Sequence, residues 1–220
     1  AYEISLGLVG SEMCIRDRFN DMDTNTVISQ IGNTPLVRLK QASELTGCHI
    51  YGKAEYFNPG ESVKDRAALF IVQDAIKRKL ISKGGTIVEG TAGNTGIGLA
   101  LIAALKGYKI ILVIPDKMSR EKILHLEGLG AEIILTRSDV PEGHPDYYHD
   151  LARSIAKETE GSFLADQFSN PANPTAHRKT TAVEMWNQMD GQLDAVVAGV
   201  GSGGTLTCLL YTSPSPRDRG

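Results

Sequence analysis

The side chain best placed for chemistry in this sequence is that of Lys64. It lies in the segment FNPGESVKDRAALF (57–70), where Ser62 and Asp65 have the spacing of a helix capping box and apolar residues follow at helical spacing. The first turn of a helix is the positive end of its dipole, so an amine that must lose its proton is favoured there over a cation. On this segment alone a solvated surface lysine is the favoured interpretation, and a reactive amine at Lys64 is the alternative that the rest of the sequence must support.

Three loops that follow predicted strands have compositions suited to a polar ligand. EGTAGNTGIG (89–98) and GVGSGGT (199–205) each contain four glycines, which allow the backbone to approach a ligand closely. The unpaired N–H groups at the start of the helix after the first loop suit a carboxylate or a phosphate, and the second loop can form an anion nest. DQFSNPANP (166–174) adds polar amides. For any one loop, turn formation alone is the alternative.

Several better-known motifs match only in part. GCHIYGK (47–53) begins like a phosphate-binding P-loop, but Ala54 stands where a hydroxyl must reach magnesium. The glycines of 199–204 satisfy the dinucleotide fingerprint, which is weak when it occurs alone. The two histidines of HPDYYH (144–149) are more typical of a solvated loop than of a metal site, and no paired nucleophile and histidine indicates acyl transfer.

The elements that must position these residues alternate between strand and helix. Continuous aliphatic strands separated by helices predict an α/β fold with a mostly parallel sheet covered on both faces, whose ligands bind at the carboxyl ends of the strands. The predicted strands are 86–90, 109–115, 131–136, 162–168 and 193–201, and the predicted helices are 94–107, 119–129, 147–161 and 175–189.

The composition excludes several classes of partner. The 220 residues are 41% hydrophobic and 22% charged, with a net charge of −3 and interleaved signs. No basic patch suggests nucleic acid, and no apolar run approaches the length of a membrane span. Three cysteines without metal spacing argue against a disulfide framework, so a reducing cytoplasm is the expected location.

Both ends of the chain differ in composition from the part between them. LVGSEMCIRDR (8–18) and CLLYTSPSPRDRG (208–220) resemble translated sequencing-adapter DNA. We therefore treat 1–18 and 208–220 as foreign tails and expect the natural protein to continue beyond residue 207. A natural Ser/Pro-rich tail is the alternative for the second segment.

Five motifs occur in the order seen in one enzyme family. Between residues 24 and 207 the chain resembles the cysteine synthase and cystathionine β-synthase family, pyridoxal-phosphate enzymes of the tryptophan-synthase-β fold type. Five motifs in register are far more specific than any one of them. They are IGNTPLVRL (31–39), NPGESVKDR (58–66), EGTAGNTGIGLAL (89–101), NPANPTAH (170–177) and GVGSGGT (199–205).

The resemblance implies fold type II of the pyridoxal-phosphate enzymes, with two α/β domains. Residues 24–60 and 170–207 would belong to the larger cofactor domain, which would be incomplete in this chain. Residues 61–169 would contain the helix of the reactive lysine and the smaller, substrate-binding domain.

The resemblance also implies a role for each site residue. Lys64 matches the lysine that holds pyridoxal 5′-phosphate as a Schiff base and later acts as a base, and Asn94 matches the residue that binds the 3′-oxygen of the cofactor. The expected phosphate ligands are Gly201, Ser202, Gly203, Gly204 and Thr205. The expected ligands of the substrate α-carboxylate are Thr91, Ala92, Gly93, Thr95 and Gln167.

The implied reaction is β-replacement. A small amino acid, O-acetylserine or serine, would lose its β-substituent, and a thiol or sulfide would take its place. Cysteine synthesis from O-acetylserine and sulfide is the expected activity, with a homodimer and a possible serine acetyltransferase partner. No metal is expected.

Alternatives remain open at the level of the sequence. Within the resemblance, cystathionine β-synthase (serine plus homocysteine) fits residues 115–133 equally well, and a dehydratase shares the fold. A nicotinamide-dependent oxidoreductase would use the glycines of 199–204 but would leave Lys64 without a role. Ala92 replaces a serine common in the family, and we expect the site to survive this change because the backbone N–H groups remain. The residue that contacts the pyridine nitrogen and the strands that complete the larger domain would lie downstream. We therefore expect the 220-residue chain itself to be inactive.

Overall fold

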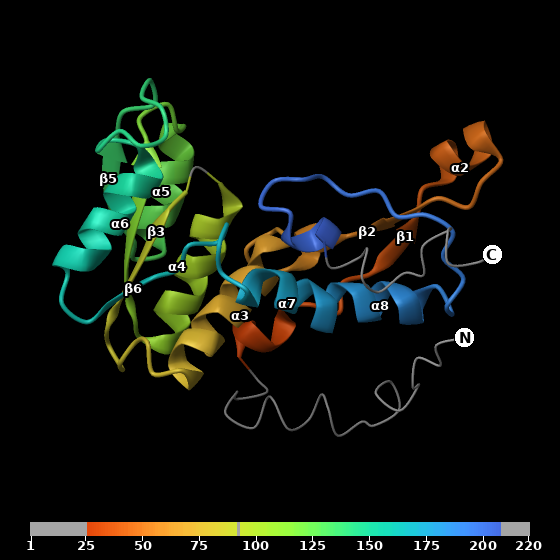
Figure 1. Cartoon of the computed structure of the whole chain (residues 1–220). Coiled ribbons are helices and arrows are strands. Elements are labelled where there is room, and N and C mark those ends of the chain that lie inside the picture. Colours follow the sequence, from red (N-terminus) through yellow and green to blue (C-terminus); the bar gives the residue numbers. More distant parts are fainter. Residues whose placement is uncertain (1–25, 92, 208–220) are drawn as a thin grey trace, which may run out of the picture.

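The fold is built around a four-stranded sheet (Figure 1). A computed structural model describes residues 26–91 and 93–207 of the chain. The strands lie in the order β5-β4-β3-β6, and every neighbouring pair is parallel. All residues of the central strand β3 are buried, as expected for a strand covered by helices on both faces. The bounds are Thr86–Gly90 for β3, Lys109–Pro115 for β4, Glu132–Thr136 for β5 and Ser162–Leu164 for β6.

Helices cover both faces of the parallel sheet. Ile87 and Leu112 point to one face, where they pack with apolar residues of α3, α4 and α5. The neighbouring strand positions Val88 and Val113 point to the other face and pack against α6. This alternation is the period of two that a pleated strand imposes. The bounds are Lys64–Lys77 for α3, Asn94–Lys106 for α4, Arg120–Gly128 for α5 and Tyr148–Glu158 for α6.

A second group of elements lies away from the parallel sheet, on the right in Figure 1. It contains the antiparallel pair β1-β2 and the helices α7 and α8. Because α3 packs against both α4 and α7, it joins this group to the parallel sheet. The bounds are Val27–Gln30 for η2, Leu36–Arg38 for β1, Lys40–Thr46 for α2, Tyr51–Lys53 for β2, Glu55–Phe57 for η3, Ala172–Lys179 for α7 and Thr181–Gln188 for α8.

The predicted α/β class with a parallel sheet is confirmed. The strands predicted at 86–90 and 109–115 have the predicted bounds, and β5 begins one residue later than predicted. These segments are runs of branched aliphatic residues limited by glycine or proline, which restricts where a strand can end.

The strand predicted over 193–201 is wrong. This segment contains no regular secondary structure, and Val197 is 98% exposed while Val200 is 66% exposed. A strand needs a hydrogen-bonded neighbour to satisfy its backbone groups. Neither sheet in the described part of the chain places a strand beside this segment, so its strand propensity has no partner.

The structure also corrects the lengths of one predicted helix and one predicted strand. The helix predicted over 175–189 is two helices, α7 and α8, which meet at Thr180 with φ −124° and ψ −76°. The side chain of Thr180 donates to the carbonyl of Ala176, a local contact that competes with helical geometry. The strand predicted over 162–168 ends at Leu164, because Asp166 has a left-handed φ of 42°.

The predicted tails 1–18 and 208–220, like Ala92, lie outside the described residues. The predicted domain boundaries stay a prediction. Every helix in the described ranges is too short or too polar to cross a membrane.

Candidate active site

Lys64 is the first residue of α3, as the helical spacing predicts. Its backbone N–H donates to Ser62 Oγ at 3.3 Å. The side chain is partly buried, and this burial lowers the pKa of the Lys64 ammonium group. A lowered pKa and a helix N-terminus both favour the neutral amine, which supports a reactive lysine over a solvated one.

The capping box predicted from Ser62 and Asp65 is wrong in its contacts. Ser62 Oγ accepts the backbone N–H of Lys64 and not that of Asp65, and the carboxylate of Asp65 accepts the backbone N–H of Gly60 in the preceding turn. Asp65 is fully buried, and its burial raises the pKa of the carboxyl to about 6. Asp65 therefore fixes the turn before Lys64 and not the helix itself.

The predicted carboxylate subsite is assembled at the carboxyl ends of β3 and β6. Thr91 Oγ1 accepts the backbone N–H of Gly93 at 3.2 Å. The hydroxyl of Thr95 donates to Gln167 Oε1, and Gln167 Nε2 lies 3.5 Å from Thr91 Oγ1. The structure thus brings Thr91, Thr95 and Gln167 into one buried cluster, although Gln167 is more than seventy positions away in the sequence. Gly93 is exposed beside the cluster, before the start of α4.

The predicted phosphate loop lies on α7. Asn173 Nδ2 donates to Ser202 Oγ at 2.9 Å, and His177 Nε2 lies 3.3 Å from Thr205 Oγ1. Gly203 has a left-handed φ of 77°, and residues 204–207 are helical. The loop therefore ends in a helix N-terminus, the arrangement that suits an anion.

His177 places this loop near Lys64. The ring is fully buried, and its burial together with the positive charge of Lys64 lowers the pKa of His177 to about 4. Its Nδ1 lies 3.1 Å from Thr181 Oγ1, and its Nε2 faces Thr205. A neutral imidazole on α7 therefore lies beside the hydroxyl of the predicted phosphate loop, and the charge of Lys64 acts on it.

Asn94 and Gly201 are exposed at the edges of this region. In the described ranges, no hydrogen bond joins either residue to Lys64 or to the other predicted ligands. Their assigned roles stay predictions.

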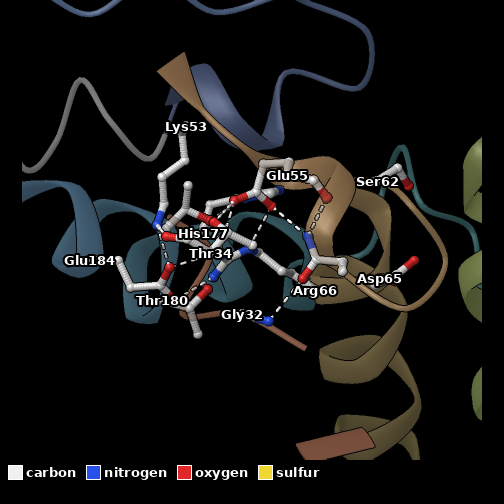
Figure 2. Close-up of polar contacts among 12 residues, drawn as sticks. Gly32, Thr34, Lys53, Glu55, Ser62, Asp65, Arg66, His177, Thr180 and Glu184 are labelled. Atoms are coloured by element: carbon white, nitrogen blue, oxygen red, sulfur yellow. Dashed lines mark hydrogen bonds and ion pairs between the residues drawn. The ribbon is translucent and has the colours of Figure 1, made fainter. Parts of the chain in front are cut away.

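Arg66, two residues after Lys64, connects the start of α3 to distant parts of the chain (Figure 2). The guanidinium is buried, with a 1% exposed side chain, and donates to Glu55 Oε2 at 2.8 Å and to Glu184 Oε1 at 2.6 Å. It also donates to Thr34 Oγ1 at 3.1 Å, and Lys53 Nζ pairs with Glu184 at 2.7 Å. The network therefore connects α3 with β2, η3 and α8.

The charged groups of this network keep one another ionised. Burial opposes ionisation of Glu184, but hydrogen bonds from Arg66 and Lys53 outweigh it and lower the pKa of Glu184 to about 2. Burial also opposes the charge of Arg66, yet hydrogen bonds to Glu184 and Glu55 raise the pKa of Arg66 above its ordinary value. Each group stays charged at neutral pH because its partners stay charged.

Glu89 lies beneath the carboxylate subsite and is 1% exposed. Burial raises the pKa of its carboxyl to about 8, against hydrogen bonds from the backbone N–H groups of Gln167 and Asp166 and from the side chain of Gln167. Its Oε2 has no hydrogen-bond partner among the described residues. A protonated Glu89 thus accepts hydrogen bonds from Gln167 without adding a negative charge beneath the predicted carboxylate subsite.

We expect Glu89→Gln to flatten the pH dependence of stability between pH 4.5 and pH 8. Because the pKa of Glu89 rises from 4.5 to about 8 on folding, the native state holds a proton that the unfolded chain has released. Native Glu89 therefore makes stability fall as the pH rises through this window. Urea unfolding at several pH values measures the effect, and equal slopes in both proteins would contradict it.

The quoted motifs contain Arg66, Glu89, Asn173 and His177, but the sequence alone indicates no role for these four residues. The signal available for Asn173 and His177 was their spacing of four residues, which places both on one face of a helix. The partners of Arg66 lie 11, 32 and 118 positions away, so no local pattern indicates them.

Comparison with known proteins places this geometry among cofactor-dependent enzymes. The sequence model of the family described as "Pyridoxal-phosphate dependent enzyme" matches residues 27–210. Over 183 residues the chain is 47% identical to cystathionine beta-synthase of Apis mellifera, covering 82% of this chain and 36% of that protein. It is 49% identical to cysteine synthase 1 of Emericella nidulans over 187 residues, which are 85% of this chain and 50% of that protein. The chain thus spans between about a third and a half of these relatives.

Solved structures agree with the sequence comparison. The chain superimposes on O-ureido-L-serine synthase with a TM-score of 0.79 at 40% identity, covering 86% of this chain and 58% of that one. A hydrogen sulfide-producing enzyme from Fusobacterium nucleatum matches with a TM-score of 0.74 at 39% identity, covering 86% and 62%.

Proposed function

The chain belongs to the family of pyridoxal-phosphate-dependent enzymes, and we propose that the full-length protein catalyses β-replacement on a small amino acid. The product proposed is L-cysteine, formed from O-acetylserine and sulfide. The observation that carries the proposal is the position of Lys64. This lysine has a lowered pKa at a helix N-terminus, and its charge acts on the buried His177, whose Nε2 lies 3.3 Å from Thr205 Oγ1 of the glycine-rich loop.

The residues present fit the cofactor of the family. Lys64 would hold it covalently, and the loop of 201–205 would hold its phosphate through hydroxyls and backbone N–H groups. The fit rests on a donor set suited to an anion, namely Ser202, Thr205 and the N-terminus of the helical turn that begins at Gly204. Asn94 would contact the ring. When bound, the cofactor supplies an electron sink for the charge that develops at the substrate Cα.

The protein's own residues would bind the amino acid and move its proton. Thr91, Gly93, Thr95 and Gln167, with Ala92 of the same loop, would receive the α-carboxylate at the start of α4. Lys64 would take the Cα proton, for which an amine with a lowered pKa is suited near neutral pH. The protonated state of Glu89 would keep the floor of this subsite free of negative charge.

The second candidate is cystathionine β-synthase activity, with serine and homocysteine as substrates. Relatives named cystathionine beta-synthase and cysteine synthase match with nearly the same identity, 47% and 49%. A nicotinamide-dependent oxidoreductase is disfavoured, since such an enzyme would not belong to the pyridoxal-phosphate family.

The location, the oligomeric state and the partner of the enzyme are also proposals. We propose a cytoplasmic homodimer that acts on a small amino acid and a thiol or sulfide, with serine acetyltransferase as a further partner. The similarity to proteins named cysteine synthase supports the amino-acid and sulfide substrates.

The test uses this chain and a version extended by the natural downstream sequence. Each is incubated with pyridoxal phosphate, reduced with borohydride and mapped by peptide mass spectrometry. A pyridoxyl adduct on Lys64 is expected, and its absence from both proteins would contradict the proposal. Assays that pair O-acetylserine or serine with sulfide or homocysteine then decide the substrates, because only one pair should give the highest kcat/KM.

A further inference from the structure

Asn173 lies between the two parts of the proposed site. Its side-chain Nδ2 donates to the backbone carbonyl of Gln167 at 2.9 Å and to Ser202 Oγ at 2.9 Å. Gln167 belongs to the carboxylate subsite, and Ser202 belongs to the phosphate loop. One amide group therefore bridges two segments that are 35 positions apart in the sequence.

The amide of Asn173 is buried, with 1% of the residue exposed, and its Oδ1 has no hydrogen-bond partner among the described residues. A buried acceptor without a partner reduces stability, so packing alone is a poor reason for an amide at this position. The two contacts of Nδ2 are what an apolar side chain of the same size could not supply.

The phosphate loop follows the shape of this amide closely. A Cβ atom added to Gly204 would lie 2.5 Å from Asn173 Oδ1 and 3.0 Å from Nδ2. No other residue type fits at Gly204 unless the loop or the amide moves. The glycine therefore allows the loop to lie against Asn173, and the hydrogen bond to Ser202 fixes the loop there.

Gln167 is held from its other side as well. The carboxyl of Glu89 receives hydrogen bonds from the backbone N–H and from the side chain of Gln167. The chain of contacts thus runs from Glu89 through Gln167 and Asn173 to Ser202, from the end of β3 to the phosphate loop.

From these contacts we propose that Asn173 is a positioning residue that fixes Gln167 and Ser202 relative to each other. This inference rests on the proposed function, because it assumes that Ser202 contacts a phosphate and that Gln167 contacts a carboxylate. Asn173 itself contacts neither ligand. Its loss should weaken both binding events, whereas the loss of Ser202 or Gln167 should weaken one.

The experiment compares Asn173→Ala, Ser202→Ala and Gln167→Ala in the full-length protein. The affinity for pyridoxal phosphate is measured by titration of the apoprotein, and that for L-serine from the absorbance change of the loaded protein. One hydrogen bond lost at each site predicts about threefold to tenfold weaker binding of both probes in Asn173→Ala. Ser202→Ala should weaken only the binding of pyridoxal phosphate, and Gln167→Ala should weaken only the binding of L-serine.

Double variants separate positioning from a general loss of structure. In the Ser202→Ala background, Asn173→Ala should cause little further loss of cofactor affinity, because its contact is already gone, yet should still weaken L-serine binding. Asn170→Ala is the matched control. This residue makes local contacts in the same loop, with Ala165 and Ala172, and should change neither affinity by more than about twofold.

Asn173→Asp keeps the volume of the side chain and covers the case in which Asn173→Ala does not fold. A carboxylate in place of the Nδ2 donor should weaken cofactor binding more than Asn173→Ala does, through repulsion of the phosphate. Losses that add fully in the Ser202→Ala background would overturn the inference. A wild-type protein that binds neither probe would instead contradict the proposed function.

Discussion

Replacing Lys64 with alanine is expected to abolish the borohydride-stable adduct and to lower turnover by about a hundredfold to ten-thousandfold, the usual contribution of a positioned acid–base group. Lys64 is the amine at the N-terminus of α3, and its burial lowers its pKa. No other side chain could take over both covalent attachment and proton removal from that position. The effect should be larger on kcat than on the affinity for the amino acid, since Lys64 is not one of the carboxylate ligands.

The control for this prediction lies on the same helix. Lys77 is exposed at the end of α3, far along the helix from the site, so Lys77→Ala should leave the adduct and the turnover unchanged. Reduction and peptide mapping report attachment, and steady-state kinetics with the preferred substrate pair report turnover. An adduct that persists in Lys64→Ala at full yield would show that another lysine carries the cofactor.

Replacing Arg66 with methionine is expected to lower the free energy of unfolding by about 3–5 kcal/mol, the usual result of removing one partner from a buried ion pair. Methionine keeps much of the side-chain volume, so the loss is mainly electrostatic. Glu55 and Glu184, whose side chains are 17% and 13% exposed, would lose the guanidinium that lowers the pKa of both carboxyl groups. The variant should also bind the cofactor more weakly, because Arg66 fixes the first turn of α3 that carries Lys64.

Arg78 supplies the matched control for Arg66. It ends the same helix and pairs with Asp74 at 3.1 Å, but its side chain is 55% exposed. Exposed pairs of this kind contribute at most about 1 kcal/mol, so Arg78→Met should be close to the wild type. Urea unfolding of both variants measures the difference. If Arg66→Met lowered the free energy of unfolding no more than Arg78→Met does, the prediction would be contradicted. Apolar packing would then replace the buried ion pairs without loss, as it does in some proteins.

Local sequence patterns are sufficient to predict the fold class, and the order of five motifs indicates the family. The strands at 86–90 and 109–115 are continuous aliphatic segments limited by glycine or proline, and such local patterns need no knowledge of distant contacts. The motifs around Lys64 and the two glycine-rich loops led to the pyridoxal-phosphate family, which the comparison confirms for residues 27–210. These features are properties of contiguous residues.

The contacts that hold the site residues in place form only in the folded chain. The partners of Arg66 and Asn173 are distant in the sequence, and the raised pKa of Glu89 depends on burial that the whole sheet creates. The same reason explains the wrong strand at 193–201: its local pattern favours a strand, but a strand also requires a neighbour to accept its hydrogen bonds. Local periodicity indicates which secondary structure a segment can form, and contacts between distant segments determine whether that structure forms.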